Sequence, residues 1–168
     1  PSSGEEGADL AALEGALSNL DVEGVVTGAI ASDYQWDRIN GVCHKLGLRV
    51  FSPLWRKDQH MILEDMLQAG MAVMIVGVYS DGLGREWLGR MLDRATVDRL
   101  SAIARARGMN VSGEGGEYET LVLDSPMHHW ELVPEGVRRE YHRDSGRLFI
   151  ERLGARGRTC SQGTGQFQ

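Results

Sequence analysis

The chain has 168 residues, of which 42% are hydrophobic and 25% charged, and its formal net charge is −6. This balance is typical of a globular protein, and the negative charge argues against nucleic-acid binding, which depends on Lys and Arg neutralising phosphates. No apolar stretch approaches the roughly 18 residues of a membrane span, so we expect neither a nucleic acid nor a membrane as partner.

The first third of the sequence alternates helical and strand-like patterns. The predicted elements are a helix over residues 8–20, a strand over 22–30, a helix over 33–46 closed by Gly47, and a short strand over 49–51 stopped by Pro53. Strands separated by helices predict a parallel sheet with crossover connections. We therefore expect an α/β fold whose first domain, residues 1–55, holds part of a Rossmann-like sheet.

The remaining sequence changes character. Helices are predicted over residues 58–69 and 96–107, on either side of a buried strand over 71–78 and a glycine-punctuated loop over 82–89. Four short strands follow, over 119–123, 130–133, 137–142 and 148–153, joined by turns such as 144–146. This succession predicts a smaller α+β domain over residues 56–153. Residues 154–168 are rich in glycine and poor in apolar side chains, so we expect a disordered tail.

Cysteine and histidine give no sign of a disulfide framework or a metal site. Cys43 and Cys160 are far apart in sequence, and the five histidines lack metal-ligand spacing. The N-terminal PSSGEEGADL is polar and acidic, unlike a secretory signal. We expect a cytoplasmic protein without a dedicated set of metal ligands.

A first candidate site follows the strand predicted over 22–30. The segment GAIASDYQWDR, from Gly28 to Arg38, opens a helix at the carboxyl edge of the expected parallel sheet, where ligands bind. The N–H groups of a helix N-terminus suit an anion, and Gln35 and Arg38 share one helix face. Ser32 and Gln35 also fit a capping box, which requires no ligand, and that interpretation stays open.

Two further segments carry candidate chemistry. In PLWRKDQ, Trp55 offers a flat face for a ring or a cation, although it could equally pack into a core. In GEGGEYE, residues 113–119, three glycines allow close backbone approach while three carboxylates crowd together. Crowded carboxylates need a cation, such as Mg²⁺, ammonium or a cationic substrate. The alternative is an exposed acidic turn.

In their order and wording, GAIASDYQWDR, PLWRKDQ, GLGREWLGR and GEGGEYETLVLDSP resemble the diphthine–ammonia ligase family, from about Glu5 to Leu153. The resemblance implies an ATP-binding domain of the PP-loop type followed by a family-specific domain. It implies amidation of diphthine on translation elongation factor 2, through an acyl adenylate that ammonia attacks, with ATP and Mg²⁺ as cofactors. The sequence leaves open whether the protein is a homo-oligomer.

The resemblance also assigns roles to individual residues. It implies catalytic roles for Gln35, Arg38 and Glu117, and a nucleotide-binding role for Gly28, Ser32 and Tyr34. Substrate binding is implied for Trp55, Gln59, Gly113, Glu114, Gly115, Gly116, Tyr118 and Glu119. Diphthine carries a quaternary ammonium, which aromatic faces and carboxylates can bind.

Two departures from the family pattern are visible. No SGGKDS phosphate loop occurs in the 168 residues, and Ser3-Gly4-Glu5 matches a segment that follows this loop in the family. The sequence leaves open whether such a loop precedes Pro1; if none does, we expect a half-built ATP site and a piece that is inactive alone. Ser125 stands where the family has Cys.

Two alternative functions stay open. They are a related PP-loop enzyme with another acceptor, such as tRNA, and a protein-binding module without catalysis.

Overall fold

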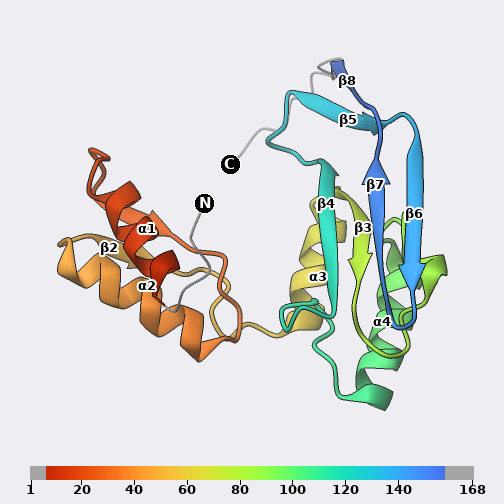
Figure 1. Ribbon diagram of the computed structural model, residues 1–168, viewed down its shortest axis with the longest axis horizontal. Helices are drawn as coiled ribbons and strands as arrows, with labels where there is room; N and C mark the ends of the chain where they lie inside the picture. The colour runs from red at the N-terminus through yellow and green to blue at the C-terminus, as the bar shows by residue number, and fades with distance from the viewer. Residues whose placement is uncertain (1–6, 158–168) are drawn as a thin grey trace, which may run out of the picture. The chain divides into compact units, whose positions relative to one another are not determined.

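The computed structural model describes residues 7–157 of the chain (Figure 1). The chain separates into two compact units, with the boundary between Asp58 and Gln59. The first unit contains a parallel pair of strands and the second contains antiparallel sheets, so the fold class is α/β, as the sequence predicts. The assignment of a nucleotide-binding role to residues 1–55 and a substrate role to 56–153 stays a prediction.

The first unit is built around one strand–helix–strand crossover. Its elements are α1 (Ala8–Leu17), β1 (Gly24–Val26), α2 (Asp33–Lys45) and β2 (Arg49–Phe51). β1 and β2 pair in parallel, with Gly24 opposite Arg49. A Cβ on Gly24 would lie 2.7 Å from the Arg49 carbonyl oxygen, so the pairing requires glycine. Cys43 on α2 is fully buried, and burial raises the pKa of its thiol.

Both β1 and α1 are shorter than the sequence predicts. The strand expected over residues 22–30 covers only three residues, and the helix expected to reach residue 20 ends at Leu17. Thr27 still donates its backbone N–H to the Phe51 carbonyl at 2.9 Å, and its hydroxyl lies 2.9 Å from that of Ser52. Beyond Thr27 the chain leaves the sheet, because it must reach the N-cap of α2 at Ser32.

The second unit combines two helices with six strands. Its elements are α3 (Gln59–Gln68), β3 (Ala72–Val78), the 3₁₀ turn η1 (Arg85–Trp87), α4 (Arg94–Arg107), β4 (Tyr118–Asp124), β5 (Trp130–Pro134), β6 (Val137–His142), β7 (Ser145–Ile150) and β8 (Leu153–Gly157). Four strands form an antiparallel sheet in the order β4-β3-β7-β6, and β5 pairs with β8. Within residues 7–157, no helix is long and apolar enough to span a membrane.

One hydrophobic core holds the second unit together. Three β-branched side chains of β3, Val73, Ile75 and Val78, are fully buried in the same cluster as Leu63 of α3 and Leu100 of α4. These branched residues favour an extended backbone and pack densely on a sheet, which explains why the apolar run forms a strand. The helix α4 begins at Asp93, whose side chain accepts from the Thr96 N–H at 2.7 Å. It ends at Gly108 in the left-handed conformation.

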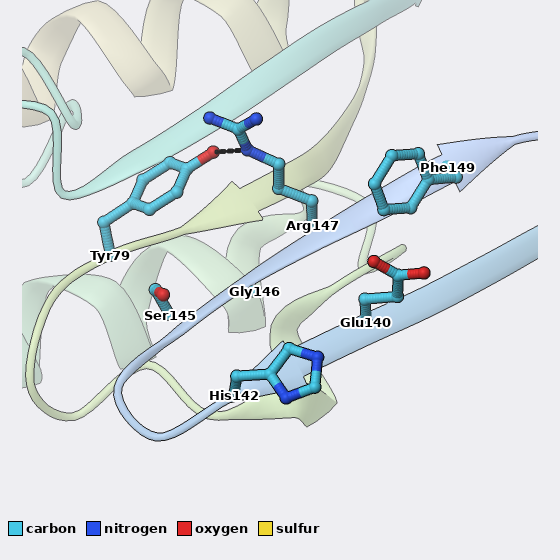
Figure 2. Close-up of a pocket in the computed structure, with 7 residues that line it drawn as sticks. All are labelled: Tyr79, Glu140, His142, Ser145, Gly146, Arg147 and Phe149. Carbon is cyan, nitrogen blue, oxygen red and sulfur yellow. Dashed lines mark hydrogen bonds between the residues drawn. The ribbon is translucent and has the colours of Figure 1, made fainter.

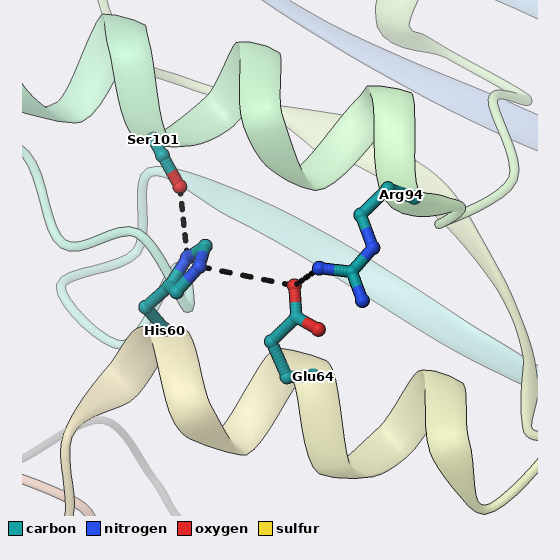
Figure 3. A network of polar contacts seen from close by, with 4 residues as sticks. All are labelled: His60, Glu64, Arg94 and Ser101. Carbon is teal, nitrogen blue, oxygen red and sulfur yellow. Dashed lines mark hydrogen bonds and ion pairs between the residues drawn. The ribbon is translucent and has the colours of Figure 1, made fainter.

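A polar network joins α3 to α4 (Figure 3). The His60 ring nitrogen Nδ1 lies 3.0 Å from the Ser101 hydroxyl, and its Nε2 lies 3.8 Å from Glu64 Oε1. The same Glu64 oxygen accepts from Arg94 Nη1 at 2.8 Å. These contacts fix the first turn of α3, where Gln59 lies.

The C-terminal strands differ from the sequence prediction. The single strand expected over residues 148–153 is divided between β7 and β8, with a bend at Glu151. The predicted turn at 144–146 is instead a two-residue loop of Arg143 and Asp144, because Ser145 already pairs with His142. Residues 154–157, expected to be disordered, form most of β8, which β5 pairs along its length. The rest of the predicted tail, 158–168, lies outside the described residues.

Candidate functional site

The first motif lies at the start of α2 and lines a hollow. Ser32 is the N-cap, and its hydroxyl accepts from the Gln35 N–H at 3.3 Å, as the capping interpretation predicts. A hollow of about 420 Å³ is lined by Asp9, Leu10, Leu13, Ser32, Tyr34, Gln35, Arg38 and Ile39. Capping and pocket formation therefore coexist. Gly28 is exposed and does not line this hollow.

Arg38 is the most constrained charge of this hollow. Its guanidinium lies 4.6 Å from the centre of the Tyr34 ring and donates a hydrogen bond to the Tyr34 hydroxyl. It also pairs with Asp9 of α1 at 2.6 Å. The Arg38 side chain is 19% exposed whereas Asp9 is 62% exposed, so the cation is fixed and its partner is accessible to solvent. An anion entering the hollow would compete with Asp9 for Arg38.

The second motif is divided between the two units. Trp55 belongs to the first, where its ring stacks on Trp36 with centroids 5.4 Å apart and an interplanar angle of 22°. The Arg56 guanidinium lies 5.6 Å from the Trp55 ring centre. Trp55 thus already has aromatic and cationic neighbours, which supports the packing interpretation. Binding of a ligand by the same ring stays a prediction.

Gln59, the first residue of α3, holds the loop that precedes β4. Its Nε2 donates to Asn110 Oδ1 at 2.9 Å. Its Oε1 accepts from the Ser112 N–H at 3.2 Å and from the Ser112 hydroxyl at 3.0 Å. The amide of Gln59 is therefore engaged at both ends within the protein, where the sequence predicts contact with substrate.

The third motif places its residues in separate environments. Gly113 and Gly116 have positive φ of 77° and 84°, as a tight loop requires. Glu117 Oε1 accepts from the Asn110 backbone N–H at 2.6 Å and from Asn110 Nδ2 at 2.9 Å. A Cβ on Gly115 would lie 2.7 Å from both Glu117 Oε1 and Asn110 Nδ2, so the glycine leaves room for this contact. Glu117 Oε2 is buried and has no hydrogen-bond partner among the described residues.

Tyr118 does not form an exposed aromatic wall, contrary to the sequence prediction. Its side chain is buried in the core of the second unit, and its hydroxyl donates to the Val111 carbonyl at 2.6 Å. Burial, with a smaller effect of the Glu117 charge, raises the pKa of Tyr118 well above its ordinary value. The ring closes the loop over residues 111–118, so it offers no face to a bulky ligand.

Glu119 points to an exposed face of the four-stranded sheet. It accepts from the Tyr79 hydroxyl at 3.1 Å, and that hydroxyl in turn accepts from Arg147 Nε at 2.8 Å. The hydrogen bond to Tyr79, and then the Glu119 charge, raise the pKa of Arg147 above its ordinary value. Tyr79 and Arg147 also line a shallow hollow of about 230 Å³ beside the β6–β7 hairpin (Figure 2).

The carboxylates of the third motif are therefore not one cation-binding cluster. Glu114 is half-buried, Glu117 turns to Asn110 and Glu119 turns to Tyr79. Residues 7–157 contain no group of three or more His, Cys, Asp or Glu side chains placed to hold a metal ion. The sequence interpretation did not find Asn110, Ser112, Tyr79 or Arg147, since each lies outside the motif that it supports.

Comparisons with known proteins cover both units. The sequence model of the diphthamide synthase C-terminal domain matches residues 58–155, and that of the diphthamide synthase N-terminal domain matches residues 1–50. A protein of Schizosaccharomyces pombe named diphthine–ammonia ligase is 43% identical over 113 residues, which are 67% of this chain and 18% of that protein. Proteins of the same name from Danio rerio and Homo sapiens are 34% and 38% identical, over 86% and 67% of this chain.

The matched regions cover only part of these relatives. They amount to 57% of the Danio rerio protein and 42% of the Homo sapiens protein. The chain thus spans less than two thirds of the length of the relatives that it matches.

Proposed function

This chain belongs to the diphthamide synthase family, and from that membership we propose that it takes part in the ATP-dependent amidation of diphthine on translation elongation factor 2. The relatives compared are named diphthine–ammonia ligase, which supports this acceptor over tRNA and over a module without catalysis. We place the reaction in the cytoplasm, where a translation factor works.

The observation that carries the proposal is the environment of Glu117. One carboxylate oxygen is held by two donors from Asn110, while Oε2 is buried and open to a further donor. A buried acceptor without a partner is costly, so such an atom is expected to meet a hydrogen-bonding group when the protein works. Ammonia carries N–H donors and is small enough to enter a confined place. We therefore assign the binding of ammonia to Glu117.

Glu117 then has a direct part in amide formation. When ammonia attacks the activated carboxyl carbon, a C–N bond would form and AMP would leave with the electrons of the C–O bond. The nitrogen must lose a proton, and Glu117 Oε2 is the acceptor for it. Glu119 is exposed and can interact with the fixed positive charge of diphthine. Tyr118 is buried and cannot.

The hollow beside α2 suits an anionic group. Arg38 is fixed there by Tyr34 and Asp9, and Ser32 marks the N-terminus of the helix. When bound, ATP supplies the activation of the substrate carboxyl group. Arg38 and Gln35 would hold an anionic group of the nucleotide or the substrate, with Ser32 and Tyr34 bordering it. Residues 7–157 gather no cluster of His, Cys, Asp or Glu side chains that could hold Mg²⁺.

The test is Glu117→Gln in the intact protein. The amide of Gln is similar in size but cannot accept a proton, and it loses a charge-assisted hydrogen bond. We expect amidation of diphthine-bearing elongation factor to fall roughly 10- to 100-fold, with the KM for ammonium raised and the KM for ATP unchanged. The exposed Glu86→Gln is the matched control and should keep full activity. Normal activity of Glu117→Gln would refute the assignment.

A further inference from the structure

We infer that Gln59 and Asn110 form a directional pair of amides that sets the orientation of the Glu117 carboxylate. Gln59 is then a positioning residue, and the contact with substrate that the motif suggests is not its role. The functional part of this inference rests on the role proposed for Glu117, whereas its structural part stands alone.

The direction of the pair is fixed at one end by the backbone. The Ser112 N–H can only donate, and it points to the Gln59 side chain at 3.2 Å, so the oxygen of that amide must lie there. The Ser112 hydroxyl lies 3.0 Å from the same oxygen. The nitrogen of the Gln59 amide is consequently turned to Asn110, where it donates to Oδ1 at 2.9 Å. No choice of amide orientation remains open at Gln59.

The same logic continues to Glu117. Because Asn110 presents its oxygen to Gln59, it must present Nδ2 to the carboxylate, and the distance to Glu117 Oε1 is 2.9 Å. The Asn110 backbone N–H reaches the same oxygen at 2.6 Å. Two donors thus converge on Oε1 and none of the described residues donates to Oε2. The two carboxylate oxygens of Glu117 are therefore inequivalent, and the amide pair sets the direction in which Oε2 points.

The pair is attached to rigid parts of the fold. Gln59 is the first residue of α3, and the adjacent His60 is held against α4 through Ser101 (Figure 3). Glu117 directly precedes β4, and its carbonyl accepts from the Tyr79 N–H at 2.9 Å. A side chain held between a helix start and a strand start can be positioned within the tolerance that catalysis requires.

The decisive variant is Gln59→Glu, which preserves the shape of the side chain but replaces the amide NH₂, a donor, with an oxygen, an acceptor. The new carboxylate still accepts from Ser112, but it has no donor for Asn110 Oδ1. The Asn110 amide is then expected to rotate, so that Nδ2 donates to the new carboxylate and no longer to Glu117. We expect the hydrogen-exchange protection of the Ser112 N–H to persist, while the Asn110 side-chain amide protons lose their nuclear Overhauser contacts with the Glu117 side chain. A general loosening of the loop would change both signals.

In activity, Gln59→Glu should raise the KM for ammonium about tenfold and leave the KM for ATP within about twofold of the parent. Gln68→Glu, the same chemical change at an exposed position on the last turn of α3, should alter neither quantity and neither NMR signal. If Gln59→Glu proves unfolded, Asn110→Ala tests the same link, since it removes Nδ2 and keeps the backbone donor. We expect a smaller rise in the KM for ammonium there.

The outcomes separate the two parts of the inference. Unchanged Asn110 side-chain signals in folded Gln59→Glu would overturn the amide pair. A changed Asn110 signal with an unchanged KM for ammonium would leave the pair in place and overturn its functional part, whereas the role proposed for Glu117 is decided separately by Glu117→Gln. The expected changes in both readouts, with Gln68→Glu silent, support the whole inference.

Discussion

At the scale of single residues, Arg38 is held by two side chains of its own unit. Tyr34 and Asp9 keep the guanidinium in the hollow at 19% exposure, so little rotamer freedom is lost when an anion binds. We expect Arg38→Ala to lower the turnover of amidation by tenfold or more, because a charge-assisted contact is removed. Stability should change little, since Asp9, the partner of Arg38 in the ion pair, is 62% exposed.

Lys45→Ala is the matched control for Arg38. Lys45 lies on the same helix and also pairs with α1, through Glu14 at 2.5 Å, but it does not line the hollow. Turnover and melting temperature are measured for both variants. An equal loss of turnover in the two would show that Arg38 acts only by holding α1 to α2.

Residue chemistry could be predicted from the sequence only in part. That Ser32 caps a helix follows from local spacing, because a capping bond joins residues three apart. That Gln59 binds Asn110 could not be predicted, since 51 residues separate them and no local pattern encodes the contact. The resemblance implies substrate binding by Tyr118, but whether this side chain faces the core or the solvent depends on how β4 pairs with β3.

At the scale of elements, the N-cap of α4 makes the stability of the second unit depend on pH. The hydrogen bonds from Thr96 lower the pKa of Asp93 below its usual range near 3.9. Because the pKa is lower in the folded state than in the unfolded state, the stabilisation is present above the unfolded pKa and is lost as pH falls through the folded pKa. We expect Asp93→Ala to lower the melting temperature at pH 7, and the difference from the parent to shrink below about pH 4.

Asp93→Asn separates the charge from the capping bond. Asparagine is also a good N-cap, so it should restore most of the stability at neutral pH. Because it does not titrate, the contribution of the N-cap to stability should no longer change with pH. Thermal melts between about pH 3 and 7 provide the measurement. A pH-independent difference between Asp93→Ala and the parent would contradict the linkage.

Helices and strands could be predicted from the sequence better than the contacts of single residues. The helices near residues 33–46 and 96–107 follow from apolar periodicity and terminal glycines, and the structure confirms both. Strand ends were less predictable because they depend on pairing partners distant in sequence. β8 illustrates this, since its glycine-rich sequence has little strand propensity and it is ordered by its pairing with β5.

At the scale of the whole molecule, the second unit has a core that is complete in itself. Every member of the large hydrophobic cluster, from Leu63 to Ile150, lies after the boundary at Asp58. We expect residues 59–157 expressed alone to fold cooperatively, with a single melting transition and dispersed NMR resonances. A molten or unfolded product would show that the first unit is required. Glu117→Gln in this piece should leave its fold intact.

The burial of Cys43 makes the first unit a reporter of its own opening. The thiol is fully enclosed on α2 and its pKa is raised, so it is a poor nucleophile while the unit stays closed. Among residues 7–157 it is the only free cysteine. Alkylation of Cys43, followed at this residue by mass spectrometry because Cys160 also carries a thiol, therefore measures how often α2 opens within the first unit.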